Sequence, residues 1–194
     1  MFPELAHDDV FRLETRRLWL RWPQAADAPA LGELAGDWDV ARMTANLPHP
    51  YRREDADHFI GRSREDNARG SALLFALTLK SLARQTIGVI GIEPSDFGPK
   101  LGYWLGRPYW GRGLASEAAA AVVDAFFLVT PRDELGATVL EENAASRGVL
   151  ENLGFVEAAR EAESASLRLA LRRRDWRARG GGLQPGCGSV TALT

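Results

Sequence analysis

The residues best suited to chemistry lie in a glycine-bearing turn that joins an apolar strand to a helix. The apolar run covers residues 101–105, and Gly111, Arg112 and Gly113 directly precede a run of helical spacing that begins at Leu114. A helix N-terminus carries unpaired N–H groups and a partial positive charge, which together bind phosphate. Glycine lets an anion approach the backbone and adopts positive φ at little cost. The turn therefore predicts a phosphate site, with Arg112 adding a charge-assisted contact.

The same turn has a purely structural interpretation, because glycine before a helix is more often structural than functional. The turn lacks the Gly-Lys-Ser/Thr ending of a P-loop and the Gly-x-Gly-x-x-Gly spacing of dinucleotide-binding folds. The prediction of a phosphate-containing ligand therefore needs support from the rest of the sequence.

Alternating strand and helix patterns must position this turn. Strands are predicted at residues 18–22, 72–79, 86–92, 101–105, 134–140, 155–158 and 167–171. Helices are predicted after Asp27, which can cap the first of them, and at about residues 53–69, 114–128 and 146–153. Arg172, Arg173 and Arg174 end the last strand, where we expect a solvated edge; the alternative is a patch that attracts an acidic substrate or RNA.

The composition describes one ordinary globular domain followed by a tail. The chain has 194 residues, of which 45% are hydrophobic and 26% charged, with a formal net charge of −2. This balance argues against nucleic-acid binding, which a strongly basic surface favours. Residues 1–176 are predicted to form the domain, and the Gly-rich residues 177–194 are predicted to be disordered.

The sequence carries no signal for a membrane, a leader peptide or a metal. No apolar run approaches the roughly 20 residues of a membrane span, and the positively charged start of a signal peptide is absent. Cys187 is the single cysteine, and the three histidines have no ligand spacing. We therefore expect a cytoplasmic protein without a metal site.

Three ordered segments, at residues 14–21, 102–118 and 143–155, together resemble the GNAT superfamily of acetyl-CoA-dependent N-acetyltransferases. Residues 102–105 (GYWL) and 109–118 (YWGRGLASEA) resemble its acetyl-CoA motif, Q/R-x-x-G-x-G/A, with Trp110 in the Q/R place. Residues 14–21 (ETRRLWLR) resemble the opening strand of the branch that contains the Rim-type ribosomal-protein N-terminal acetyltransferases. Residues 143–155 (NAASRGVLENLGF) resemble that branch's N-x-x-S … L-G-F segment. The resemblance spans residues 13–176.

The resemblance implies an α/β fold with a central mixed, mostly antiparallel twisted sheet of six to seven strands, flanked by about four helices. It also implies that acetyl-CoA is the co-substrate. Backbone groups of Trp104 and Leu105 would bind the pantetheine arm on a splayed strand, and Asn143 and Ser146 would face the thioester end. The pyrophosphate would be held by the amides of the turn and the helix start, next to Trp110: Gly111, Arg112, Gly113, Leu114 and Ala115.

Acetyl transfer requires a neutral amine, a donor for the developing oxyanion and a partner for the leaving thiolate. An α-amine has a pKa of about 8 and a lysine of about 10.4, so a base or a water chain must help. A backbone N–H of residues 101–105 could serve the oxyanion. By the family analogy Ser146 serves the thiolate. On the residues alone, an N-cap for the following helix is the stronger interpretation of Ser146.

The identity of the base is open in the sequence. Relatives in the Rim-type branch often carry Glu directly before the Gly-Tyr-Trp strand, where this chain has Lys100. Glu93, at the end of a predicted strand, Glu141, and Glu142, directly before Asn143, are the remaining candidates, and Asp96 is a weaker one. Each is more often a solvated carboxylate, and a water chain is the alternative.

Three functions are compatible with these features. The first is acetylation of a protein or peptide N-terminal α-amine by direct attack in a ternary complex. The second is acetylation of a small amine such as an amino acid, a polyamine or an antibiotic. The third is a non-catalytic acyl-CoA-binding module. The predicted acceptor groove, built by residues 27–69 and the loop before the last strand, is too mixed in charge to choose among them. Homodimers are common in the family, although nothing in these residues indicates one.

Overall fold

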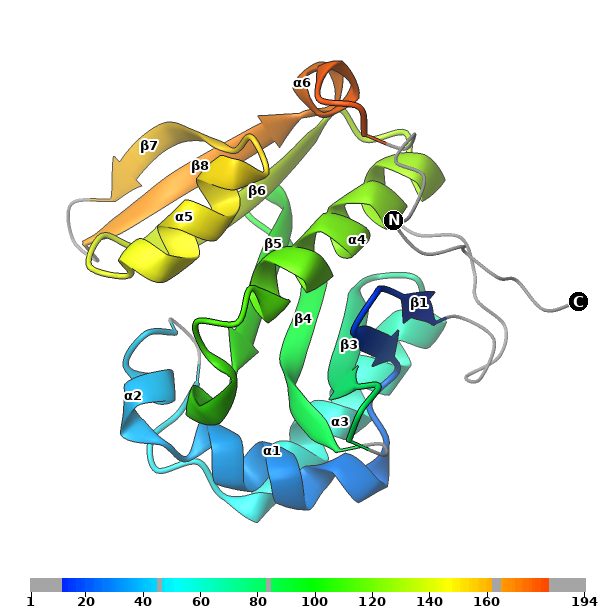
Figure 1. The fold of residues 1–194 in the computed structure, drawn as a ribbon, viewed down its shortest axis with the longest axis vertical. Coiled ribbons are helices and arrows are strands. Elements are labelled where there is room, and N and C mark those ends of the chain that lie inside the picture. The colour runs from blue at the N-terminus through cyan, green and yellow to red at the C-terminus, as the bar shows by residue number, and fades with distance from the viewer. Residues whose placement is uncertain (1–11, 45–46, 83–84, 162–164, 182–194) are drawn as a thin grey trace, which may run out of the picture.

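The protein is built around one twisted sheet of eight strands (Figure 1). The computed structural model describes residues 12–44, 47–82, 85–161 and 165–181. The strand order is β1-β2-β3-β4-β5-β6-β8-β7, and every neighbouring pair is antiparallel except β5 and β6. The strands are β1 (Leu13–Glu14), β2 (Leu18–Arg21), β3 (Leu73–Leu79), β4 (Thr86–Ser95), β5 (Gly98–Leu105), β6 (Glu134–Leu140), β7 (Val156–Glu161) and β8 (Ser166–Arg172).

Six α-helices and two short 3-10 turns, η1 and η2, connect these strands in the described part of the chain. They are η1 (Ala25–Asp27), α1 (Ala28–Ala35), α2 (Trp38–Ala41), α3 (Arg53–Ala68), η2 (Arg107–Tyr109), α4 (Leu114–Val129), α5 (Ala144–Asn152) and α6 (Arg173–Ala178). Among the described residues, none of the helices has the length and apolarity that crossing a membrane requires.

The predicted mixed, mostly antiparallel sheet is confirmed, and the structure adds short elements to it. β1 has two residues, α2 four and α6 six, which is too short for an apolar period to be visible in the sequence. The predicted hairpin of β3 and β4 is present. β4 and β5 form a longer ladder than expected, because Pro94 and Pro99 face each other within it rather than ending the strands.

Helices cover the two faces of the sheet, which we call the α4 face and the α3 face. Leu101 and Leu105 of β5 point into the larger core, which contains the buried side of α4. Trp104 points to the opposite face and packs with Val89 against α1 and α3. Successive residues of a strand alternate between faces, so Lys100 and Trp104 share the α3 face. In Figure 1, α4 crosses the sheet diagonally, with α5 beside it and α1 at one end of the molecule.

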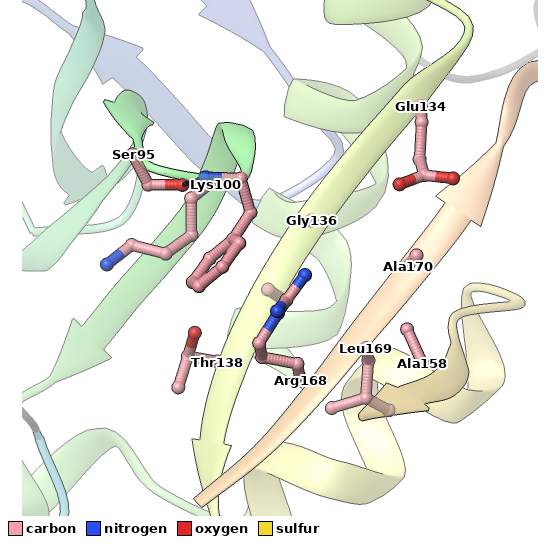
Figure 2. Close-up of a pocket in the computed structure, with 11 residues that line it drawn as sticks. Ser95, Lys100, Glu134, Gly136, Thr138, Ala158, Arg168, Leu169 and Ala170 are labelled. Atoms are coloured by element: carbon pink, nitrogen blue, oxygen red, sulfur yellow. Dashed lines mark hydrogen bonds between the residues drawn. The ribbon is translucent and has the colours of Figure 1, made fainter. Parts of the chain in front are cut away.

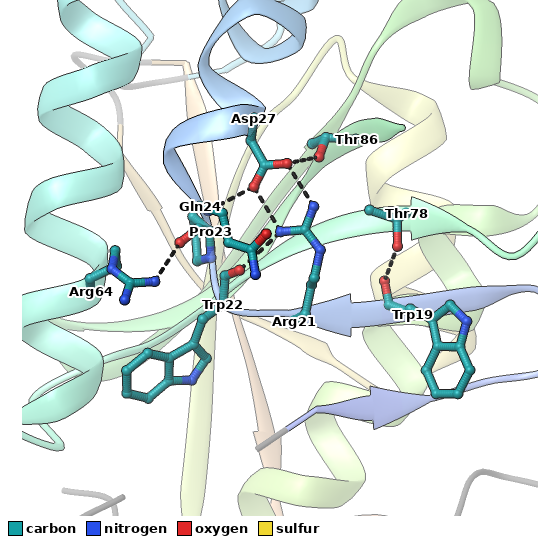
Figure 3. A network of polar contacts seen from close by, with 9 residues as sticks. All are labelled: Trp19, Arg21, Trp22, Pro23, Gln24, Asp27, Arg64, Thr78 and Thr86. Atoms are coloured by element: carbon teal, nitrogen blue, oxygen red, sulfur yellow. Dashed lines mark hydrogen bonds and ion pairs between the residues drawn. The ribbon is translucent and has the colours of Figure 1, made fainter. Parts of the chain in front are cut away.

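Asp27 does not cap α1 as the sequence predicted. Its carboxylate is 3% exposed and receives two hydrogen bonds from Arg21, at 2.8 and 2.7 Å, and one from Thr86 Oγ1 at 2.6 Å (Figure 3). The amide of Gln24 also donates to it, at 2.7 Å. Burial alone would raise the pKa of Asp27, but these hydrogen bonds outweigh it, so the pKa lies below its ordinary value. The cap was predicted from local spacing, whereas the actual partners come from β2 and β4.

The predicted solvated edge at the end of the last strand is corrected at Arg173. Arg173 begins α6 and is largely buried, since its guanidinium donates to the carbonyls of Phe127 and Thr130 at the end of α4. These carbonyls have no partner within the helix, so the arginine satisfies them. The predicted tail begins inside α6, which continues to Ala178, and residues 182–194 lie outside the described residues.

Candidate functional site

β5 and β6 separate along their length at the centre of the sheet. These parallel strands pair at only two positions, Lys100 with Gly136 and Leu101 with Ala137, although both continue for at least three more residues. On its other side β5 stays paired with β4 through Leu105. Backbone groups of β5 beyond Leu101 therefore face a gap, and unpaired backbone groups are strong hydrogen-bonding sites. The gap opens at the end of β5 that leads through η2 into α4.

The N-terminus of α4 has the backbone geometry that an anion site requires. Gly111 has a φ of 70°, and Gly113, the N-cap residue, has a φ of 68°. No side chain caps this helix end, and the first turn closes with the Glu117 amide donating to the Gly113 carbonyl at 3.1 Å. A Cβ on Gly111 would meet no atom within 4 Å. The backbone is therefore accessible, and the preceding amides of the turn can donate to an anion.

The predicted coenzyme residues that follow β5 gather around this turn. The ring of Trp110 is 42% exposed, and its Nε1 donates to the Leu105 carbonyl over 2.7 Å. This hydrogen bond holds the turn against β5, and the Leu105 carbonyl keeps one lone pair for a ligand. Leu114 is buried in the core, so it can offer only its backbone, whereas Arg112 is exposed.

An ion-pair network that sequence reasoning missed anchors this turn to the start of the sheet. Arg17 Nε donates to Glu117 Oε2 over 2.6 Å, and Arg17 Nη1 donates to the Arg112 carbonyl over 2.8 Å. Thr15 Oγ1 and the Arg17 amide both donate to Glu117 Oε1, at 2.6 and 2.7 Å. Burial alone would raise the pKa of Glu117, but these hydrogen bonds hold it below its ordinary value. The signal was present in residues 14–21, whose match to an opening strand did not reveal a partner a hundred residues away.

Ser146 faces β5 and does not cap α5. Asn143 is the N-cap residue, and its Oδ1 accepts from the Ser146 amide over 3.0 Å, so the capping role expected of Ser146 was wrong. The Ser146 hydroxyl lies 3.0 Å from the Tyr103 hydroxyl, which also donates to the Ser146 carbonyl over 3.2 Å. Burial raises the pKa of Tyr103 to about 12, against the smaller effect of its hydrogen bond with Ser146. Tyr103 therefore stays protonated, and it joins β5 to α5 beside the gap.

Of the predicted bases, the structure brings Glu93 to the paired end of the gap. Glu93 on β4 is the register partner of Lys100 on β5, so both lie on the α3 face where β5 and β6 are still paired. Glu93 Oε1 accepts from Arg62 Nη2 over 3.2 Å. Glu142 is exposed in the turn that follows β6, directly before Asn143.

The segment around α2 contacts the ends of both separating strands. Arg107, directly after β5, forms an ion pair with Asp39 of α2 at 2.9 Å. Asn143, after β6, donates from Nδ2 to the Met43 carbonyl over 3.2 Å. This segment therefore closes the open end of the gap and forms one wall of any groove that leads into it. In the described part of the chain, no group of three or more His, Cys, Asp or Glu side chains is placed to hold a metal.

Comparison with known proteins identifies a family. Residues 17–156 match the acetyltransferase (GNAT) domain. An uncharacterized N-acetyltransferase of Bacillus licheniformis is 30% identical over 146 residues, which is 74% of this chain and 81% of that protein.

Two solved structures share the fold at low identity. RimJ of Mycobacterium smegmatis, in complex with a CoA disulfide, is 21% identical with a TM-score of 0.72, over 93% of this chain and 98% of that one. RimL, a ribosomal-protein α-N-acetyltransferase in complex with coenzyme A, is 18% identical with a TM-score of 0.72, over 83% and 97%. The gap between β5 and β6, the uncapped start of α4 and the matched domain agree, and the chain therefore belongs to the GNAT acetyltransferase family.

Proposed function

We propose that this protein transfers the acetyl group of acetyl-CoA to a protein or peptide N-terminal α-amine, by direct attack in a ternary complex. The observation that carries the proposal is the gap between β5 and β6, which leads directly to the uncapped N-terminus of α4. An extended arm that ends in a diphosphate fits this combination, because the arm can hydrogen-bond the open strand edge while the diphosphate meets the helix amides.

In this proposal the coenzyme residues act mainly through their backbone. The amides of residues 111–115 bind the pyrophosphate, with Trp110 holding the turn in place. Leu105 binds the pantetheine arm along the open edge of β5, whereas the backbone groups of Trp104 point to β4, because Trp104 and Val89 form a hydrogen-bonded pair of that ladder. Asn143 and Ser146, at the start of α5, lie beside the thioester end. The structures of RimJ and RimL with bound coenzyme support a coenzyme site in this fold.

The thioester supplies an activated acetyl carbon and a thiolate leaving group, and the side chains around the gap manage the protons. A new bond joins the acceptor nitrogen to the acetyl carbon as the carbon–sulfur bond breaks. Glu93, acting through water, takes the proton that the ammonium loses before attack, and the proton that the nitrogen loses after attack replaces the one given to the departing thiolate. A backbone N–H of β5 stabilises the carbonyl oxygen as it gains charge. The Ser146 hydroxyl donates to the sulfur while the protonated Tyr103 donates to Ser146.

The acceptor approaches from the α3 face, because α4 and α5 cover the other face of the sheet at the gap. The fold neighbours RimJ and RimL are ribosomal-protein or Rim-type acetyltransferases, which supports a peptide α-amine as the acceptor. A peptide backbone also suits a site at the edge of a separated strand.

Two measurements test the proposal. Calorimetric titration with acetyl-CoA tests the coenzyme site, and release of free thiol with a panel of acceptors tests transfer. The panel contains peptides with a free N-terminus, the same peptides with a formylated N-terminus and an added lysine, and small amines. Turnover that requires the free α-amine supports the proposal. Binding with turnover only on small amines would replace the peptide by a small acceptor, and binding without turnover would leave an acyl-CoA-binding module.

A further inference from the structure

A shallow pocket lies on the α3 face, directly beside the paired end of the gap (Figure 2). It spans β5, β6 and β8, and the turn between β4 and β5 forms one side of it. Its volume is about 340 Å³ including the space open to solvent, which suits one polar side chain rather than a large ligand.

The floor of the pocket is hollow because two small residues, Gly136 of β6 and Ala170 of β8, lie side by side in it. Lys100 of β5 pairs with Gly136 of β6, and Gly136 pairs with Ala170 of β8. A Cβ on Gly136 would meet only backbone oxygens at 3.4 and 3.9 Å, so nothing but the missing side chain leaves this space open. The pocket is therefore part of the sheet itself, with Lys100 beside Gly136 on the neighbouring strand.

Two cations, Lys100 and Arg168, and one carboxylate line the pocket. The Arg168 guanidinium stacks over the Phe97 ring, with its carbon 3.3 Å from the ring centroid, which fixes the guanidinium at the pocket side. Glu134 is the acidic residue among those lining the pocket, and it pairs with Arg172 at 3.7 Å, outside the pocket. Within the described residues, neither Lys100 nor Arg168 has a carboxylate at ion-pair distance. The pocket therefore presents two half-buried cations that form no ion pair with any described residue.

The position of the pocket relates these charges to the reacting amine. Lys100 and Gly136 mark the level at which β5 and β6 begin to separate, and the acceptor approaches from this face. Two residues along a strand cover about 6.6 Å, so an anion beside Lys100 would lie within about that distance of the level at which β5 and β6 separate. A Lys ammonium and an Arg fork are the groups that bind a carboxylate.

We infer that the pocket of Lys100, Arg168 and Phe97 binds a carboxylate of the acceptor, so that the enzyme selects amines flanked by an acidic group. The inference rests on the proposed function and specifies its substrate. The second or third residue of an acidic peptide carries this carboxylate, and so does a small amino acid with an acidic side chain.

The test compares acceptors that differ only in charge. The peptides Ser-Glu-Glu-Ala-amide and Ser-Gln-Gln-Ala-amide are assayed by thiol release, and free glutamate is compared with free glutamine. The acidic peptide is expected to have a KM lower by about tenfold, the scale of a lost charge pair at a partly exposed site. Lys100→Gln and Arg168→Gln should each remove most of this difference with kcat unchanged, and Arg168→Glu should reverse it. Arg160→Gln, an exposed arginine on β7 that pairs with Glu157, is the matched control and should change nothing.

Failure of this inference is distinguishable from failure of the proposed function. Equal KM values for the two peptides, or an acidic preference that survives in both glutamine variants, would overturn the pocket assignment while leaving peptide acetylation intact. If neither peptide is acetylated, calorimetric titration of the CoA-bound protein with both peptides decides. Binding that prefers the acidic peptide and is lost in Arg168→Gln supports the pocket alone, and unselective or absent binding rejects it. If neither peptide is acetylated and free glutamate is preferred over free glutamine, the carboxylate that binds the pocket belongs to a small acceptor.

Discussion

The hydroxyl oxygens of Tyr103 and Ser146 lie 3.0 Å apart and join β5 to the first turn of α5. The Tyr103 hydroxyl also donates to the Ser146 carbonyl, so in this arrangement the serine proton is directed at the tyrosine oxygen. A donor role for Ser146 toward sulfur therefore requires the two hydroxyls to reverse, with Tyr103 donating to Ser146 Oγ. The 3.0 Å contact allows either hydroxyl to be the donor.

Removing the Tyr103 hydroxyl should lower turnover without weakening coenzyme binding. Tyr103→Phe keeps the buried ring but leaves Ser146 without its partner. We expect kcat to fall by about tenfold, at the lower end of effects on proton-transfer groups. Ser146→Ala should produce a similar loss, and the double variant should lose no more than either alone, because the two act as one unit. Additive losses would show that the hydroxyls act separately.

Turnover should not fall in the alkaline range in which free tyrosine titrates. Because the pKa of Tyr103 is raised to about 12, its proton is retained through the range in which the acceptor amine becomes neutral. kcat/KM should therefore rise to a plateau near the acceptor pKa, which is about 8 for an α-amine. A decline between about pH 9 and 10 in wild type that is absent in Tyr103→Phe would contradict the assignment.

Substitution of Gly113 by alanine should destabilise the fold, and substitution by glutamate should abolish coenzyme binding. Its φ of 68° strains any side chain, so Gly113→Ala should lower the free energy of unfolding by about 1 kcal/mol. Gly113→Glu adds a carboxylate where the pyrophosphate is proposed to bind, and calorimetry should then detect no acetyl-CoA binding. If Gly113→Glu bound acetyl-CoA as tightly as Gly113→Ala does, the proposed pyrophosphate site at this helix end would be wrong.

The Arg17–Glu117 ion pair should support coenzyme affinity from outside the site. Glu117→Gln keeps the shape but weakens the hold on Arg17, whose Nη1 positions the Arg112 carbonyl. We expect the Kd for acetyl-CoA to rise by about tenfold with little change in kcat. Arg53→Gln breaks an exposed pair with Asp57 on α3 and serves as the control, with no effect on Kd.

Asp27 should make stability depend on acid pH. Asp27→Asn leaves Arg21 partly buried without its charge partner, which should lower the free energy of unfolding by about 3 kcal/mol at neutral pH. The folded pKa of Asp27 is depressed, so its contribution is fully present above the unfolded value of about 3.9 and is lost as pH falls through the folded pKa. Urea unfolding should therefore show that the difference in free energy of unfolding between wild type and variant becomes smaller in acid. If this difference in free energy of unfolding were independent of pH, the loss of stability would come from packing.

The sequence predicted the long, periodic elements well, because their signal lies in residues that are close together in the chain. The apolar face of α4 and the continuous apolar runs of β3 and β4 are visible because burial on the sheet imposes a period or a run. The turn around Gly113 was predictable for the same reason, since positive φ and a helix start both leave marks within a few residues.

Features that depend on distant partners were not predictable. Asp27 looked like a helix cap, and only the fold brings Thr86 and Arg21 to its carboxylate. Ser146 looked like an N-cap by residue type, but Asn143, three residues earlier, is an equally good cap and is the one that the helix uses, which residue type alone does not decide. Arg173 looked solvated because nothing near it in sequence announces the open carbonyls at the end of α4.

The two register pairs between β5 and β6 also divide the sheet into a five-stranded and a three-stranded unit with little backbone hydrogen bonding between them. A ligand that lies along the open edge of β5 would replace the missing rungs of this ladder. Amide hydrogen exchange in β6, β8 and β7 should then follow a local opening of the smaller unit in the ligand-free protein, and should slow to the rate of global unfolding when ligand is bound. In those terms a ligand bound along β5 would join the two units into one cooperative fold.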